Sequence, residues 1–218
     1  MTLVLLPGLG ADHRLFEPQR AVFSDLLVPP WIVPKRKETL PDYAARLAET
    51  IVAGRPMVLG GSSFGGMVAW EMARHLRPEA VVLIGSCRSP KALHAVARGL
   101  RPIVPLTAVQ VFDLAKVFAP LGLKMFSPFT PEQRALCVAM FKEMDGGFMK
   151  WACRAILGWV PGEPPPVPVF QIHGGKDRIM PARLVEADEI IPDGGHLINL
   201  THPEQINAFI TRALESVR

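Results

Sequence analysis

Short apolar runs alternate with helical patterns along most of this chain of 218 residues. Most runs are rich in valine, leucine and isoleucine and lack polar alternation, as strands do when helices cover both faces of their sheet. The runs that predict strands are Leu3–Leu6, Trp31–Val33, Met57–Leu59, Ala80–Ile84, Val167–Ile172 and a short one near Glu189–Ile191. Because helical patterns separate them, we expect a three-layer α/β fold with a mostly or fully parallel sheet of about six strands.

Three helical patterns accompany the predicted strands. Thr39 can cap a helix that carries an apolar stripe and has Pro41 in its first turn. The segment Gly65–Leu76 is apolar on nearly all sides, which predicts a buried central helix. The last helix begins at Pro203 and carries its apolar residues on one face.

The alternation stops between Cys87 and Pro166, where several helix-like pieces follow one another without a convincing strand. These pieces are roughly Pro90–Arg101, Leu106–Phe118, Pro131–Met144 and Phe148–Trp159. A proline-rich run over residues 161–166 closes the segment. We interpret residues 87–166 as a helical cap inserted into an α/β core of residues 1–86 and 167–218, with the proline run as a stiff return. The run can also be a peptide ligand for a partner domain, although it is short and lies between ordered elements.

The composition argues against several classes of protein. The net charge is only +4 and the basic residues are scattered, which is unlike a nucleic-acid surface. Three cysteines without metal-type spacing argue against a disulfide-stapled secreted fold and favour a reducing cytoplasm. The N-terminal apolar run ends at Pro7-Gly8 with no basic segment before it, unlike a signal peptide or a membrane span. We therefore expect a soluble, cytoplasmic protein without a metal or cofactor; the sequence does not indicate its oligomeric state.

A glycine-rich turn joins one predicted strand to the predicted central helix. In this turn Gly61, Ser63 and Gly65 fit the pattern G-x-S-x-G. A sharp strand-to-helix turn strains its central residue and leaves no room for side chains two positions before and after it. Ser62 cannot be the central residue, because Phe64 would then stand where a glycine is required. A plain glycine-rich turn with capping serines is the alternative, but the strand–turn–helix context favours Ser63 as a nucleophile.

A second glycine-rich loop, Leu5-Leu6-Pro7-Gly8-Leu9-Gly10, follows the first predicted strand. Glycines at the carboxyl end of a strand let the backbone approach a ligand. We expect the backbone N–H groups of Leu9 and Phe64 to donate to a developing oxyanion. A phosphate-binding loop is the competing interpretation. However, Asp12 and His13 follow instead of a third glycine, and an anionic Asp12 would repel a pyrophosphate.

An acid and a base follow two later strands. Asp177 ends the sequence Gln171-Ile172-His173-Gly174-Gly175-Lys176-Asp177, and His196 ends Pro192-Asp193-Gly194-Gly195-His196. With Ser63 they stand in the chain order Ser, Asp, His, which is that of the α/β-hydrolases. On these motifs the chain resembles the α/β-hydrolase superfamily, and most of all its small bacterial members with a helical cap. The resemblance implies that Ser63 attacks a carbonyl carbon, His196 shuttles the proton and Asp177 orients His196.

The sequence departs from the family pattern in two places. The family usually has His-Gly where this chain has Pro7-Gly8, which leaves the backbone oxyanion role intact but removes a side-chain support. The chain also begins at the strand before that loop, so we expect no leading antiparallel hairpin and an all-parallel sheet of about six strands. Some relatives carry the acid after the strand before the cap, but Ser86-Cys87-Arg88-Ser89 offers no carboxylate, so Asp177 stands.

The resemblance implies a serine hydrolase that cleaves a small or medium carboxylic ester or thioester. Apolar residues of the predicted cap are by default packing, with a few reaching a ligand. Among these we expect Met140 and Trp151 to contact substrate, together with His13 beside the oxyanion loop. The same scaffold supports acyl transfer, carbon–carbon bond hydrolysis and lyase chemistry, and a non-catalytic ligand receptor can keep the fold. A pure receptor need not retain the serine, the acid and the base together.

Overall fold

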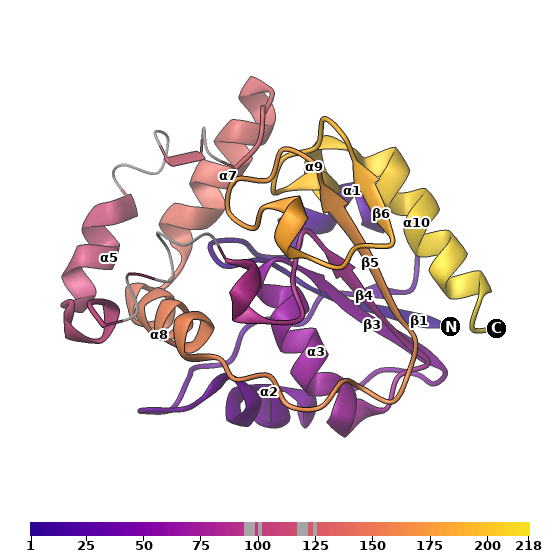
Figure 1. The fold of residues 1–218 in the computed structure, drawn as a ribbon, viewed down its shortest axis with the longest axis horizontal. Coiled ribbons are helices and arrows are strands. Elements are labelled where there is room, and N and C mark those ends of the chain that lie inside the picture. The colour runs from indigo at the N-terminus through magenta and orange to yellow at the C-terminus, as the bar shows by residue number, and fades with distance from the viewer. Residues whose placement is uncertain (94–98, 100–101, 117–121, 124–125) are drawn as a thin grey trace.

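Six parallel strands form a sheet at the centre of the protein (Figure 1). The structure is a computed structural model that describes residues 1–93, 99, 102–116, 122–123 and 126–218. The strands are β1 (Thr2–Leu6), β2 (Leu26–Leu27), β3 (Met57–Ser62), β4 (Ala80–Ile84), β5 (Val169–Gly174) and β6 (Glu189–Ile191). Their spatial order is β2-β1-β3-β4-β5-β6, and each neighbouring pair is parallel. This confirms the expected parallel sheet of about six strands.

The outermost strand beside β1 differs from the prediction. Residues Leu26–Leu27 pair with β1, whereas Trp31–Val33 forms no strand. The backbone N–H and C=O of Ile32 both bond to the Tyr43 hydroxyl, at 3.1 and 3.0 Å. Prolines also flank this run, and proline has no N–H to donate to a sheet. The prediction was wrong because these backbone groups bond to a side chain instead of to a strand.

Helices cover both faces of the sheet and complete three layers. Alternate residues of β1 point to opposite faces, so Val4 and Leu6 belong to one core and Leu3 and Leu5 to the other. On the first face pack α2 (Leu40–Ala48) and α3 (Phe64–Leu76). On the second face lie η1 (His13–Phe16), α1 (Glu17–Arg20), α9 (Ile198–Thr201) and α10 (Pro203–Glu215). As predicted, α3 is buried along nearly its whole length, because apolar residues surround it.

Helices also occupy the segment between β4 and β5. They are η2 (Pro90–Ala92), η3 (Val104–Leu106), α5 (Val109–Ala115), α7 (Pro131–Glu143) and α8 (Gly146–Gly158); η6 (Ala182–Leu184) follows β5. Thr130 and Gln133 form a capping box at the start of α7, and Asp145 caps α8. In Figure 1, α5, α7 and α8 stand together beside the sheet.

Part of this segment was predicted differently. Within the predicted helix Pro90–Arg101, η2 is a short 3₁₀ turn, and residues 94–98 and 100–101 lie outside the described residues. The division of the chain into a core and a cap of residues 87–166 stays a prediction. Across the residues for which the structure gives an account, no helix has both the length and the apolar character to cross a membrane.

Candidate active site

The serine, the acid and the base identified in the sequence lie at the same edge of the sheet. Ser63 follows β3, Asp177 follows β5 and His196 follows β6. The carboxyl ends of parallel strands meet at one edge, which is where α/β proteins place their binding sites. Three segments far apart in the sequence therefore converge there.

Ser63 occupies a strained turn between β3 and α3. Its backbone angles are φ 52° and ψ −120°, in a region that residues other than glycine rarely adopt. A Cβ atom added at Gly61 would lie 2.5 Å from the carbonyl carbon of Gly65 and 2.7 Å from the Leu6 carbonyl oxygen. One added at Gly65 would collide with the same Leu6 oxygen. Both glycines are therefore required by close backbone contacts, as the pattern predicted.

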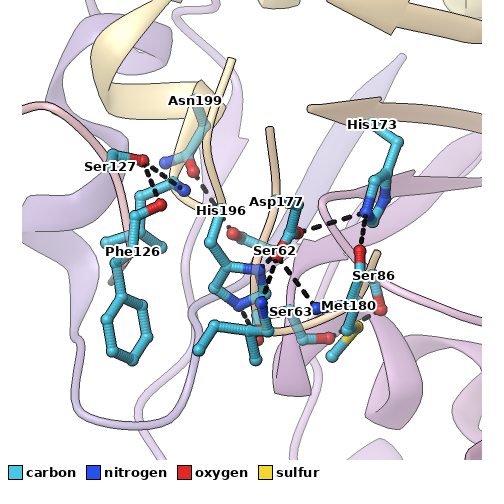
Figure 2. A network of polar contacts seen from close by, with 12 residues as sticks. Ser62, Ser63, Ser86, Phe126, Ser127, His173, Asp177, Met180, His196 and Asn199 are labelled. Carbon is cyan, nitrogen blue, oxygen red and sulfur yellow. Dashed lines mark hydrogen bonds and ion pairs between the residues drawn. The ribbon is translucent and has the colours of Figure 1, made fainter. Parts of the chain in front are cut away.

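The neighbouring serine has a different environment. Ser62 is fully buried, and its hydroxyl donates to Asn199 Oδ1 at 3.2 Å. Ser63 is partly exposed, and its hydroxyl points to His196 (Figure 2). Of the two serines, only Ser63 can therefore meet a molecule entering from solvent.

A continuous chain of hydrogen bonds joins the three side chains (Figure 2). Ser63 Oγ lies 2.8 Å from His196 Nε2, and His196 Nδ1 lies 2.7 Å from Asp177 Oδ2. An ionised carboxylate only accepts, so Nδ1 carries a proton, and Nε2 of the neutral ring is free to accept from the serine hydroxyl. His196 is 1% exposed, which shields these bonds from competing water.

Asp177 is held in one orientation by three hydrogen-bond donors and a facing histidine. Its Oδ1 accepts from the backbone N–H groups of Ile179 and Met180, at 2.8 and 2.9 Å. Its Oδ2 accepts from His196 and lies 3.1 Å from His173 Nε2. Burial opposes the negative charge, but the facing His196 and the donated hydrogen bonds outweigh it. The pKa of Asp177 therefore lies well below its usual range, and the side chain is ionised.

His173 is a further residue of this site; its place at a strand end predicts a bond to nearby backbone or a position at the floor of the site. Its ring is fully buried, and Nε2 donates to the Met180 carbonyl at 2.7 Å while facing Asp177. The carbonyl is an acceptor only, so Nε2 carries the proton. The spacing of four residues between His173 and Asp177 at a strand end was the available signal for this contact.

The two residues predicted to donate to the oxyanion, Leu9 and Phe64, lie on segments next to Ser63. Phe64 is the first residue of α3, so its N–H has no acceptor within the helix. Leu9 lies in the loop after β1, and both Leu9 and Ser63 line one cavity. A Cβ atom added at Gly8 would lie 3.5 Å from Ser63 Cβ, so this loop runs directly past the serine. Both predicted oxyanion donors are therefore on segments adjacent to Ser63.

A cavity of about 420 Å³ opens over Ser63. Its walls come from the loop after β1, from α7 and from the turn around His196, and they are almost entirely apolar. The lining residues are Gly8, Leu9, Gly10, Ala11, Ser63, Gly122, Leu123, Phe126, Cys137, Met140, Phe141, His196 and Leu197. Burial raises the pKa of the Cys137 thiol to about 11, so it stays neutral. The cavity therefore suits an uncharged, apolar group placed against the serine.

Of the three residues predicted to contact substrate, Met140 lines this cavity and the other two do not. The His13 side chain is 64% exposed on η1, facing solvent. Trp151 packs in an aromatic cluster, with its ring 4.3 Å from that of Tyr43 and 6.1 Å from that of Phe64. The predictions for His13 and Trp151 are corrected accordingly, because solvent surrounds one side chain and core packing encloses the other.

Candidate metal ligands are not clustered among the residues that the structure describes. Across residues 1–93, 99, 102–116, 122–123 and 126–218, no group of three His, Cys, Asp or Glu side chains has an arrangement that could hold a metal ion.

Comparisons with known proteins relate nearly the whole chain to one family. The sequence pattern of the alpha/beta hydrolase family matches residues 3–209. No curated protein matches the sequence. An esterase from Thermogutta terrifontis with bound malate is 20% identical, with 100% of this chain and 90% of that chain covered and a TM-score of 0.74. An esterase from Exiguobacterium antarcticum is 12% identical, with 99% and 92% covered and a TM-score of 0.76. MenH from S. aureus is 18% identical, with 99% and 94% covered and a TM-score of 0.75. At these identities, the three structures share the fold of this chain.

Proposed function

Because the chain belongs to the alpha/beta hydrolase family, we propose that it is a serine hydrolase of the carboxylesterase kind. It would cleave a small or medium carboxylic ester or thioester through an acyl-enzyme on Ser63. The observation that carries this proposal is the hydrogen-bonded chain from Ser63 through His196 to Asp177 at the wall of an apolar cavity.

Each member of the chain has a defined part in the first step. A serine hydroxyl is a weak nucleophile, so His196 Nε2 accepts its proton as Ser63 Oγ attacks the carbonyl carbon. Asp177 keeps the other ring proton on Nδ1 and stabilises the imidazolium that forms. The depressed pKa of Asp177 suits this part, because the carboxylate stays charged at neutral pH.

The tetrahedral intermediate carries a negative oxygen that needs donors. The N–H groups of Leu9 and Phe64 would supply them, and losing one such donor typically costs about 3–4 kcal/mol of barrier. When the intermediate collapses, the carbon–oxygen or carbon–sulfur bond breaks and His196 gives its proton to the leaving alcohol or thiol. Water then attacks the acyl-enzyme with His196 as base, which releases the acid and restores Ser63.

The cavity suggests the kind of acyl group. Among the residues that the structure describes, the lining offers no charged partner for a second carboxylate or an ammonium group on the acyl chain. The volume of about 420 Å³ lies within the range of about 300–1,000 Å³ that is typical of small-molecule sites. A neutral, apolar acyl group of medium length therefore fits best.

The state of the cysteines bears on the compartment in which the protein acts. The three cysteines are free thiols, and each has a raised pKa because of burial. A reducing compartment such as the cytoplasm keeps thiols in this state. We therefore propose a cytoplasmic enzyme acting on a small molecule.

A panel of chromogenic esters from acetate to decanoate, with the matching acyl-CoA thioesters, tests the proposal. Wild-type protein should hydrolyse members of the panel, and Ser63→Ala should lose nearly all of this activity. Circular dichroism and thermal unfolding should show that the variant folds. A folded Ser63→Ala protein with near-normal turnover would contradict the proposal.

A further inference from the structure

The backbone N–H groups of the catalytic base His196 and of the next residue, Leu197, donate hydrogen bonds to Phe126 and Ser127, which are distant in the sequence (Figure 2). The N–H of His196 donates to the Phe126 carbonyl oxygen. The N–H of Leu197 donates to Ser127 Oγ at 3.1 Å. The Ser127 hydroxyl itself donates to the Phe126 carbonyl at 2.6 Å. Phe126 and Ser127, which lie between β4 and β5, thus hold the main chain of the loop that carries His196 by hydrogen bonds.

The chain around this contact is built for close approach. A Cβ atom added at Gly195 would lie 2.5 Å from Ser127 Oγ, so only glycine lets the two segments meet. Ser127 is 6% and Leu197 9% exposed, so water has little access to replace a lost partner. A buried N–H group left without an acceptor is unfavourable, which makes the Ser127 hydroxyl hard to dispense with.

The contact with Phe126 and Ser127 fixes the main chain of His196, whereas Asp177 bonds only to its imidazole ring. Asp177 fixes the Nδ1 end of the imidazole, whereas the Phe126 carbonyl fixes the main chain from which the ring projects. The Phe126 ring also stands against the imidazole, with centroids 5.6 Å apart and an interplanar angle of 64°. On the other side, a Cβ atom at Gly85 would lie 2.6 Å from the His196 carbonyl oxygen. The main chain at His196 thus lies against both Gly85, the residue after β4, and the Phe126–Ser127 segment.

We propose that Ser127 is a positioning residue for His196, because its hydroxyl holds the Phe126 carbonyl and the Leu197 N–H in one arrangement. This keeps Nε2 at its 2.8 Å separation from Ser63 Oγ. The inference rests on the proposed function of Ser63 and His196. A misplacement of about 1 Å between reacting groups can lower a rate by about a hundredfold, so a loosened base should have a large effect. Ser127 does not line the cavity, so its effect should fall on turnover and not on substrate binding.

The matched pair Ser127→Thr and Ser127→Val tests this. The two variants add the same bulk and differ in the hydroxyl. In Ser127→Val, the amides of His196 and Leu197 should exchange their hydrogens faster than in Ser127→Thr. The rates of fluorophosphonate labelling at Ser63 and of ester turnover should fall about tenfold or more relative to Ser127→Thr. The KM for a neutral ester should stay within about twofold, since Ser127 itself does not line the cavity and every lining side chain is retained. Ser127→Ala provides a second variant without the hydroxyl if Ser127→Val does not fold.

Each other outcome overturns a stated part of the inference. Equal labelling and turnover in folded Ser127→Val and Ser127→Thr would show that the hydroxyl does not position the base. If the labelling rate and the turnover of Ser127→Val fall only in proportion to its loss of folded protein, Ser127 has a purely structural role. If wild-type protein is labelled but its His196 and Leu197 amides exchange freely, the contact is wrong and the proposed function stands. If those amides are protected but wild-type protein is not labelled, the proposed function fails, and the positioning role with it.

Discussion

Substitution of Trp151, in the segment between β4 and β5, can show whether this residue serves packing or contacts substrate. The Trp151 side chain is 6% exposed, and its Nε1–H donates to the Glu38 carbonyl at 2.9 Å. Its ring contacts those of Tyr43, Phe64 and Phe148, and it lies outside the cavity over Ser63. Truncating a buried tryptophan typically costs about 3–5 kcal/mol, which is a large share of a total stability of about 5–15 kcal/mol.

We therefore expect Trp151→Ala to lower the free energy of unfolding by about 4 kcal/mol in urea titrations. Trp151→Phe keeps a ring but removes the donor to Glu38, so it should lose about 1–2 kcal/mol. For whatever fraction of either variant folds, the ratio of kcat/KM between short and long acyl esters should match that of wild-type protein. A Trp151→Ala protein that keeps its stability within about 1 kcal/mol but changes this ratio would refute the packing account.

Two further predictions concern the cavity wall and the acid. Met140→Ala should raise kcat/KM for longer acyl esters relative to shorter ones. Each methylene newly accommodated should stabilise the transition state by about 1 kcal/mol or more, while Met140→Leu should change the profile little. An unchanged chain-length profile in Met140→Ala would show that Met140 serves packing alone. The pKa of Asp177 is lower in the folded protein than its usual value of about 4, so the stability from its charge is fully present above that usual value and is lost as pH falls from it toward the lower pKa of the folded state. Urea titrations between about pH 6 and pH 3 should therefore show the stability advantage of wild-type protein over Asp177→Asn shrinking, and parallel pH dependences would contradict this.

The local motifs were sufficient to locate the residues at the edge of the sheet. The glycines around Ser63 follow from close backbone contacts within one turn, which a short sequence pattern records. Parallel strands then bring their carboxyl ends together, so residues after β3, β5 and β6 could be expected to meet. In the structure His196 Nδ1 and Asp177 Oδ2 do meet, at a distance of 2.7 Å.

The remaining errors share one physical cause, which is dependence on contacts between distant residues. Trp31–Val33 has the composition of a strand, but the Tyr43 hydroxyl takes the backbone groups of Ile32. Trp151 and Met140 are both apolar residues on helices between β4 and β5, and packing alone decides that one faces the aromatic cluster and the other the cavity. Nothing in the sequence near Ser127 indicates that it meets Leu197, since 70 positions separate the two residues.

Covalent labelling by a fluorophosphonate probe, located by mass spectrometry, tests the central claim most directly. An activated nucleophile reacts with such a probe, whereas an ordinary serine hydroxyl does not. The account predicts that wild-type protein and Ser62→Ala are labelled at Ser63, and that Ser63→Ala and His196→Ala are not. Absence of labelling in folded wild-type protein, or labelling that persists in Ser63→Ala, would contradict it.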